Sequence, residues 1–114
     1  MPSIAEFVEI VRGFPEVEEK PHFEKISFRV KNKILATLSE KDYRITLKLS
    51  EADQDVYGLF DPSSIYPVPN KWGKQGWTFV ELNTVHRDIL MDALKSAYTC
   101  VAPKHLVDLL NKNS

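Results

Sequence analysis

Residues 21–49 alternate apolar and polar side chains in three successive runs. The runs cover residues 25–30, 34–38 and 43–49. A period of two places alternate side chains on opposite faces of a β-strand, so one face can enter a core while the other meets solvent or a partner. The pattern predicts a three-stranded antiparallel meander. Asn32, in the turn between the first two strands, can adopt the left-handed conformation that a tight hairpin needs.

Apolar residues three and four positions apart predict two helices that flank this meander. The first begins at a capping box formed by Ser3 and Glu6 and ends at Gly13. An acidic connector over residues 14–19 is expected to lead from it to the first strand. Ser50 caps the second helix, whose apolar side chains are expected to face inward: Val56, Leu59 and Phe60.

The second half of the chain adds two strands and two helices to this pattern. Residues 65–69 predict a short edge strand, because their two prolines cannot donate to a central ladder. Residues 70–76 are expected to form a turn or a mobile loop, and residues 77–82 a strand. A long helix is expected to start at residue 83 or 84, and Pro103 is expected to occupy the first position of a last helix.

The order of the predicted elements is α-β-β-β-α-β-β-α-α. Antiparallel strands with helices on one face define the α+β class, and we expect a two-layer sandwich with a five-stranded antiparallel sheet. A length of 114 residues, with 43% hydrophobic and 27% charged residues, is typical of one globular domain that spans residues 1–114.

Charge is distributed unevenly along the chain. Residues 20–48 contain eight lysines and arginines and three acids, whereas the rest contains seven basic and thirteen acidic residues. The net charges of the two parts are therefore plus 5 and minus 6, and the basic part coincides with the meander. Such a distribution favours a positive face on the sheet, although lysines on an exposed sheet face also serve solubility.

The strongest candidate site is the sheet face opposite the helices together with the loop before the last strand. Basic groups there can neutralise phosphates, the lysines of the first hairpin can act as a wing, and aromatic rings can stack on bases. The predicted nucleic-acid-binding residues are Lys25, Arg29, Lys31, Lys33, Arg44, Lys48, Lys71, Trp72, Lys74, Trp77 and Phe79. The alternative is a solvated face whose aromatic side chains pack under a loop or against a second subunit.

The segment from Trp72 to Trp77 allows two interpretations. It has two indoles and two glycines in an irregular connection, and such connections often carry binding sites. Trp72 can equally cover the end of the core. An exposed aromatic patch here would also suit a protein partner.

The residues that usually carry catalysis or bind metals form no recognisable motif. The three histidines lack metal-ligand spacing, and the single cysteine permits neither a standard zinc site nor an internal disulfide. We therefore expect no metal, no cofactor and no enzymatic activity. An enzyme would have to assemble ordinary residues such as His22, Glu24 and Tyr66. No apolar run is long enough to span a membrane, and a cytoplasmic location is expected.

The chain resembles the MmcQ/YjbR family of small bacterial proteins over nearly its whole length. The resemblance rests on residues 14–19, 28–30 with 33–34, 47–49, 72–77 and 96–98. It implies the same arrangement of helices and five strands, and it implies DNA binding by a domain shaped like a winged DNA-binding domain. Family members more often have two glycines where this chain has Lys31-Asn32.

Two functions are therefore expected from the sequence. The first is DNA binding without catalysis, through phosphate contacts made by the basic sheet face and the hairpin tip. The alternative is an adaptor that binds a protein or a second copy of itself through a sheet edge or an exposed aromatic patch.

Overall fold

The structure is a computed structural model that describes residues 2–112. Its first helix, α1 (Ile4–Arg12), begins at the predicted capping box: the Ser3 hydroxyl accepts the Glu6 amide at 3.1 Å, and the Glu6 carboxylate accepts the Ser3 amide at 3.3 Å. The cap satisfies two of the amides that the start of a helix leaves without partners. Gly13 ends α1, as predicted.

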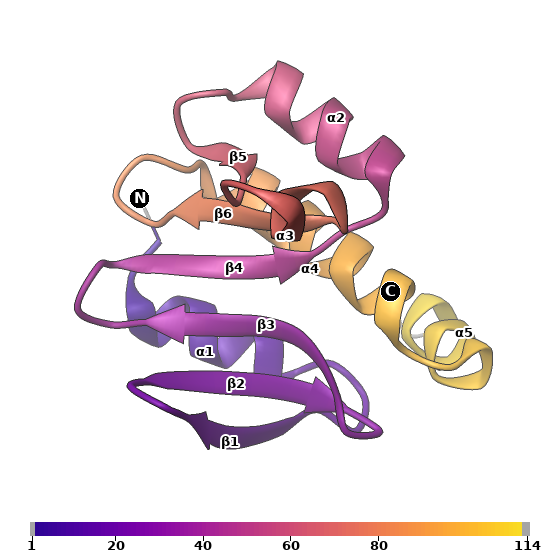
Figure 1. Ribbon diagram of the computed structural model, residues 1–114. Helices are drawn as coiled ribbons and strands as arrows, with labels where there is room; N and C mark the ends of the chain where they lie inside the picture. The colour runs from indigo at the N-terminus through magenta and orange to yellow at the C-terminus, as the bar shows by residue number, and fades with distance from the viewer. Residues whose placement is uncertain (1, 113–114) are drawn as a thin grey trace.

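One antiparallel sheet of six strands forms the centre of the described chain (Figure 1). Its strands, in chain order, are β1 (Glu18–His22), β2 (Lys25–Val30), β3 (Lys33–Ser39), β4 (Arg44–Lys48), β5 (Ile65–Pro67) and β6 (Trp77–Glu81). Their order in the sheet is β1-β2-β3-β4-β6-β5. The predicted meander is confirmed, and β5 is at an edge as predicted. Asn32 has a φ of 66°, as the β2–β3 turn was predicted to need.

The prediction of five strands was wrong, because β1 forms from part of the segment interpreted as an acidic connector. It pairs with β2 from Glu18 opposite Arg29 to His22 opposite Lys25. None of its side chains is buried. An edge strand without a buried face has no need of apolar alternation, so the sequence carried no strand signal there. The observed element order is therefore α-β-β-β-β-α-β-α-β-α-α.

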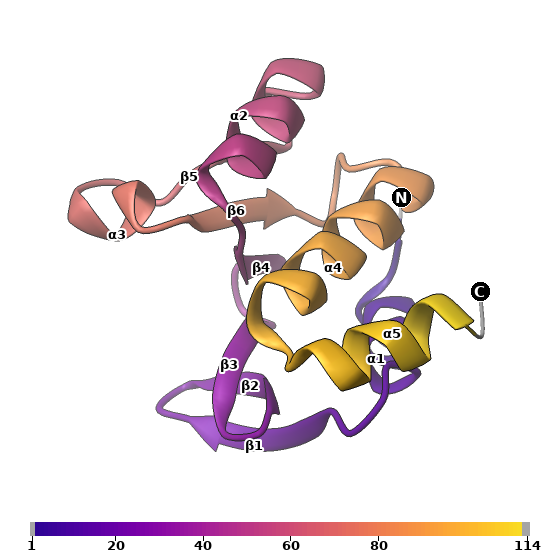
Figure 2. The same ribbon diagram turned by 90° about the vertical axis from the view of Figure 1, so that its right-hand side faces the viewer.

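The hydrophobic core lies between the sheet and a layer of three helices. Figure 2 shows α1, α4 (Arg87–Val101) and α5 (Lys104–Lys112) together on one side of the sheet. One row of the inner sheet face runs across four strands, with Leu38 opposite Ile45, Ile45 opposite Val80, and Val80 opposite Ile65. These side chains are no more than 1% exposed. The α+β class and the two layers are thus as predicted, with a sixth strand added.

Helix α2 (Glu51–Phe60) lies beyond the β5 edge of the sheet, and its orientation differs from the prediction. Val56, Leu59 and Phe60 were expected to face inward, but they are 61%, 85% and 72% exposed. The residue that α2 buries is Gln54. Its amide nitrogen donates to the Gly73 carbonyl at 2.9 Å and to the Thr78 hydroxyl at 3.0 Å. These hydrogen bonds turn the polar side of α2 toward the protein.

The run before β6 contains a short helix, α3 (Lys71–Lys74), in place of the predicted turn or mobile loop. The Asn70 side chain accepts the Trp72 amide at 3.1 Å and starts this helix. Gly73 packs so closely that a Cβ there would lie 2.0 Å from the Val68 carbonyl oxygen. Figure 2 shows α3 on the side of the sheet opposite α4, so helices cover mainly, but not only, one face.

The boundaries of the last two helices depart only slightly from the prediction. Helix α4 begins after His86, whose Nδ1 accepts the Asp88 amide at 3.2 Å, rather than at residue 83 or 84. The break at Ala102-Pro103 and the helix after it are as predicted, but α5 begins at Lys104, so Pro103 precedes its first position instead of occupying it.

Candidate nucleic-acid interface

The sheet face away from the helix layer carries a polar row that ends in two aromatic rings. The strand register places these residues opposite one another in the order Ser27, Thr37, Thr46, Phe79 and Tyr66. Most of the neighbouring residues along these strands are buried on the core side, as the predicted alternation requires. In β3 the prediction was wrong, because a register shift opposite Phe28 and Arg29 places Ile34 on the open face and buries Leu35 beside Ala36. Phe79 and Trp77 lie on the open face, as expected from the phase of β6.

This open face is hollowed into a groove of about 460 Å³. Helix α3 forms one side of it, and the β1–β2 turn, with His22 and Lys25, forms the other. Its apolar lining consists of Ile34, Val68, Trp72, Trp77 and Phe79. Trp72 is 49% exposed, so its indole is available to a bound molecule. We call this feature the sheet groove.

Three of the predicted aromatic residues each lie beneath a predicted cation. The Arg44 guanidinium carbon is 4.6 Å from the centre of the Phe79 ring. The ammonium groups of two lysines occupy similar positions, with Lys48 at 5.7 Å from the Trp77 ring and Lys71 at 5.8 Å from the Trp72 ring. Cation–π contact of this kind orients a positive group over an aromatic surface. The structure therefore brings these predicted residues into one surface of alternating rings and positive charges.

Two of the residues predicted to contact phosphate are paired with carboxylates of the protein itself. Arg44 Nε donates to the Glu81 carboxylate at 3.1 Å, and the hydrogen bond raises the pKa of Arg44. Lys31 is 2.8 Å from Glu16, and this hydrogen bond lowers the pKa of the Glu16 carboxyl. Each pair is locally neutral, so its cation contributes less positive charge to the surface.

Two further predicted residues donate hydrogen bonds to neutral acceptors. Lys48 Nζ donates to the Gln75 carbonyl, and Arg29 Nε donates to the Ser27 hydroxyl at 2.9 Å. Both keep their positive charge available. Within residues 2–112, the side chains of the remaining four predicted lysines make no hydrogen bond or ion pair with the protein: Lys25, Lys33, Lys71 and Lys74.

Sequence reasoning missed a carboxylate beside this surface, at the end of β6. Glu81 accepts hydrogen bonds from Arg44 and from the Tyr66 hydroxyl, and the second bond raises the pKa of Tyr66. The pairing of Arg44 with Glu81 joins residues that are 37 positions apart. The alternation in β6 could have found it, because Glu81 has the same phase as Trp77 and Phe79.

The residues suggested for an enzyme do not meet. His22 and Glu24 lie at the β1–β2 turn, whereas Tyr66 is in β5, at the opposite edge of the sheet. Among the described residues there is also no group of three histidine, cysteine, aspartate or glutamate side chains arranged to hold a metal. Over the same part of the chain, no helix is long and apolar enough to cross a membrane.

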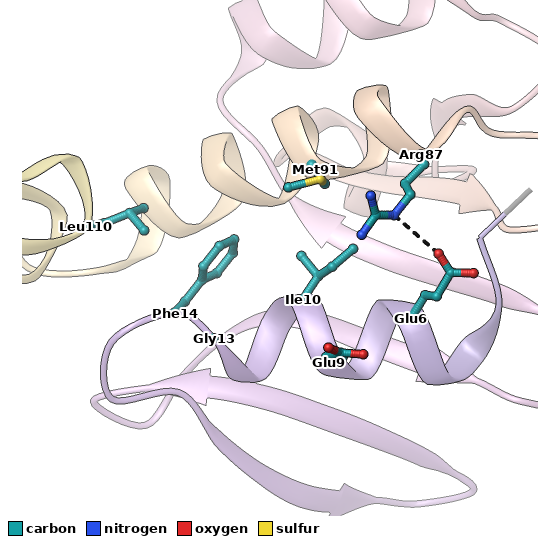
Figure 3. Close-up of a pocket in the computed structure, with 8 residues that line it drawn as sticks. All are labelled: Glu6, Glu9, Ile10, Gly13, Phe14, Arg87, Met91 and Leu110. Atoms are coloured by element: carbon teal, nitrogen blue, oxygen red, sulfur yellow. Dashed lines mark ion pairs between the residues drawn. The ribbon is translucent and has the colours of Figure 1, made fainter. Parts of the chain in front are cut away.

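A second hollow, of about 320 Å³, follows the junction of α1, α4 and α5 (Figure 3). Its apolar lining comes from Ile10, Phe14, Met91 and Leu110. An ion pair of 3.2 Å between Arg87 and Glu6 crosses one end. None of the predicted site residues lines this hollow, which we interpret as an incompletely filled seam between packed helices.

The fold and the sheet groove define a class: small α+β proteins whose antiparallel sheet is covered by a helix layer on one face and left largely open on the other. The chain belongs to the YjbR family, whose model matches residues 12–100. This agrees with the resemblance found in the sequence. No curated protein matches the chain.

Two solved structures share the fold. One is a protein of Deinococcus radiodurans described by a DUF419 domain, with a TM-score of 0.77 and 22% identity, over 97% of this chain and 89% of that one. The other is a protein from Pseudomonas syringae, with a TM-score of 0.67 and 17% identity, over 88% of this chain and 99% of that one. At these identities the similarity concerns the fold.

Proposed function

We propose that the protein binds nucleic acid in the sheet groove without catalysing a reaction, and that it prefers single strands. The observation that carries the proposal is the set of three aromatic rings, each beneath a cation, along one groove. Exposed rings can stack on unpaired bases, and each such stack contributes roughly 1–3 kcal/mol in single-strand binders. Paired bases in a duplex keep their faces covered by their neighbours, so they cannot use these rings.

The phosphates would be contacted by the lysines around the groove. Lys25 lines the groove itself. Lys33 and Lys48 line an adjoining hollow that shares Ile34 and Trp77 with it. The hairpin tip takes part through Lys33, because Lys31 is directed to Glu16. Aromatic groups at the floor and cations at the rim match the bases and the backbone of a strand.

The test is fluorescence anisotropy of a short labelled oligothymidylate and of a duplex, at about 50 and 200 mM salt. We expect micromolar binding to the single strand, weaker binding to the duplex, and a steep loss of affinity at the higher salt. Reversal of the charge at Lys25, Lys33 and Lys71 should lower the affinity about tenfold or more at the lower salt. Trp72→Ala should weaken single-strand binding and leave duplex binding almost unchanged.

The matched control reverses three lysines on the helix layer: Lys95, Lys104 and Lys112. It changes the net charge by the same amount but leaves the groove intact, so affinity should stay close to that of the unmodified protein. Equal losses in the two triple variants, or no binding at the lower salt, would refute the proposal. In the second case the aromatic groove becomes a candidate surface for a protein partner.

One substitution, at Glu81, is expected to raise the affinity for single strands. Glu81→Gln keeps the shape of the side chain and an oxygen that can accept from Tyr66, but it removes the negative charge beside Arg44. The Arg44 guanidinium is then free to attract a phosphate, so single-strand affinity should rise a few-fold at the lower salt. Anisotropy measures this directly. Asp108→Asn on α5 is the control and should not change affinity, since Asp108 pairs with Lys104 on the helix layer.

A further inference from the structure

Helix α2 presents its apolar stripe to solvent. Val56, Leu59 and Phe60 follow the spacing of one helix face, and all three are more exposed than any other large apolar side chain of the described chain except Phe23. An amphipathic helix in a globular protein normally directs such a stripe into the core. Exposed clusters of large apolar side chains usually mark surfaces that contact another molecule.

The outward orientation of the stripe is held by specific contacts on the opposite side of the helix. Gln54 is 7% exposed and donates to Gly73, Trp77 and Thr78. The hydroxyls of Tyr57 and Ser96 are 3.0 Å apart and connect α2 to α4. Rotation of α2 that would bury Leu59 would break these hydrogen bonds and leave buried polar groups without partners, which is costly. The exposed stripe is therefore a fixed feature of the fold.

A groove of about 240 Å³ runs beside the stripe, between α2 and α4. Val56, Tyr57, Phe60 and Ile89 form its apolar lining, and the carboxylates of Asp53 and Asp92 flank it. Figure 2 shows α2 beside the first half of α4, with no other helix or strand of residues 2–112 drawn across the two. We call the groove and the exposed stripe together the α2 surface.

The charged side chains of α2 and of the groove lining are all acidic. Residues 50–61 contain four acids, Glu51, Asp53, Asp55 and Asp61, and no basic residue. Asp92 adds a further carboxylate from α4. Such a surface opposes nucleic acid and anionic lipid headgroups. It complements a segment that joins apolar side chains to positive charges.

We propose that the α2 surface binds a basic amphipathic helix of a partner protein. The apolar side of that helix would lie against Val56, Leu59 and Phe60 and in the adjoining groove, as amphipathic helices do in hydrophobic grooves. Lysines or arginines at its margins would face Asp53, Asp55 and Asp92. This inference is independent of the sheet groove and of its proposed ligand.

The probe for the test is a labelled synthetic peptide that combines leucines at helical spacing with lysines at all other positions. A matched peptide replaces every lysine with glutamate. We expect anisotropy to show saturable binding of the basic peptide and none of the acidic one. In heteronuclear NMR, the amide shifts caused by the basic peptide should map to residues 51–60 and to the first half of α4. Shifts that map to the sheet groove, or equal binding of both peptides, would overturn the proposal.

Two variants separate the apolar and the electrostatic contributions. Leu59→Ser with Phe60→Ser should weaken binding roughly tenfold or more, because central apolar contacts dominate such interfaces. Asp53→Asn with Asp92→Asn should weaken it several-fold and reduce its salt dependence. All four side chains are at least partly exposed, so the fold should persist, and circular dichroism checks this.

Leu109→Ser and Glu40→Gln are the matched controls, since they remove an exposed apolar group and an exposed carboxylate far from α2. Affinity unchanged in the α2 variants would overturn the proposal. The alternative is that a second copy of the protein occupies the α2 surface, and sedimentation velocity of the protein alone tests it. A dimer that dissociates in the Leu59→Ser variant would support this alternative and overturn the proposal.

Discussion

Replacement of Gly76 by alanine is expected to lower the free energy of unfolding by about 3 kcal/mol or more. Gly76 has a φ of +102°, a conformation that side-chain-bearing residues rarely adopt. A Cβ there would lie 2.0 Å from the backbone oxygen of Leu49, which cannot move without disturbing the start of α2. The Gly76 carbonyl also accepts the Leu49 amide at 2.9 Å. Urea denaturation followed by circular dichroism measures the effect.

Gly58→Ala is the matched control for this substitution. Gly58 lies in α2, and a Cβ there meets only the Ile65 carbonyl oxygen, at an ordinary contact distance of 3.9 Å. Alanine favours helix, so this variant should be as stable as the unmodified protein or up to about 1 kcal/mol more stable. Full stability of Gly76→Ala would contradict the close approach of Gly76 to the Leu49 carbonyl.

Gln54→Glu should destabilise the protein by about 3 kcal/mol at neutral pH, and the loss should shrink in acid. The substitution keeps the size of the side chain but replaces an amide that donates to three oxygens with a carboxylate that donates to none. Burial beside those oxygens will raise the pKa of the new carboxyl above its value in the unfolded chain. The folded state therefore binds the proton more tightly than the unfolded state.

The direction of the pH dependence follows from this difference. Below the pKa of the unfolded chain the carboxyl is protonated in both states, and the deficit in stability is smallest. As the pH rises through the raised pKa of the folded state, stability relative to the unmodified protein falls. Urea denaturation at about pH 4.5 and 7.5 compares the two conditions. The exposed neighbour Gln75 provides a control, since Gln75→Glu should show no such deficit. An equal deficit in stability of Gln54→Glu, relative to the unmodified protein, at both pH values would contradict the hydrogen bonding described for Gln54.

Local patterns in the sequence were enough to predict the elements that bury one face. The meander of β2, β3 and β4, the cap of α1 and the stripe of α4 are all present. The expected alternation fails in β3 at Ile34 and Leu35, where the pairing with β2 shifts its register. Strand β1 was missed because its stability comes from pairing with β2 rather than from a buried face of its own. Pairing across a sheet leaves no periodic trace in an edge strand that is exposed on both sides.

The orientation of α2 shows what periodicity leaves undetermined. The spacing of Val56, Leu59 and Phe60 correctly describes one apolar side of a helix. It does not say whether that side meets the protein or the solvent. The orientation of α2 is fixed by Gln54, which donates hydrogen bonds to residues 19 to 24 positions further along the chain. Such long-range hydrogen bonds are invisible to any local pattern.

The side chains of the candidate site were predictable because, like the meander, they follow the two-residue alternation of β-strands. The phase of β6 correctly placed Trp77 and Phe79 on the open face, and the two-residue alternation placed Lys48 and Arg44 on the same side. The pairing of Arg44 with Glu81 and the curvature that hollows the sheet groove depend on how distant segments meet. The sequence therefore predicted the composition of the surface and not its shape.

Both outer strands of the sheet contain a proline, Pro21 in β1 and Pro67 in β5. Proline offers no N–H, so neither border presents an unbroken row of donors to an incoming strand. Charged Glu18, Glu19 and Lys20 add to this protection along β1. Growth of the sheet from one molecule into the next, the usual first step toward fibrils, is thereby discouraged at both borders. The protein should tolerate high concentration without forming cross-β aggregates.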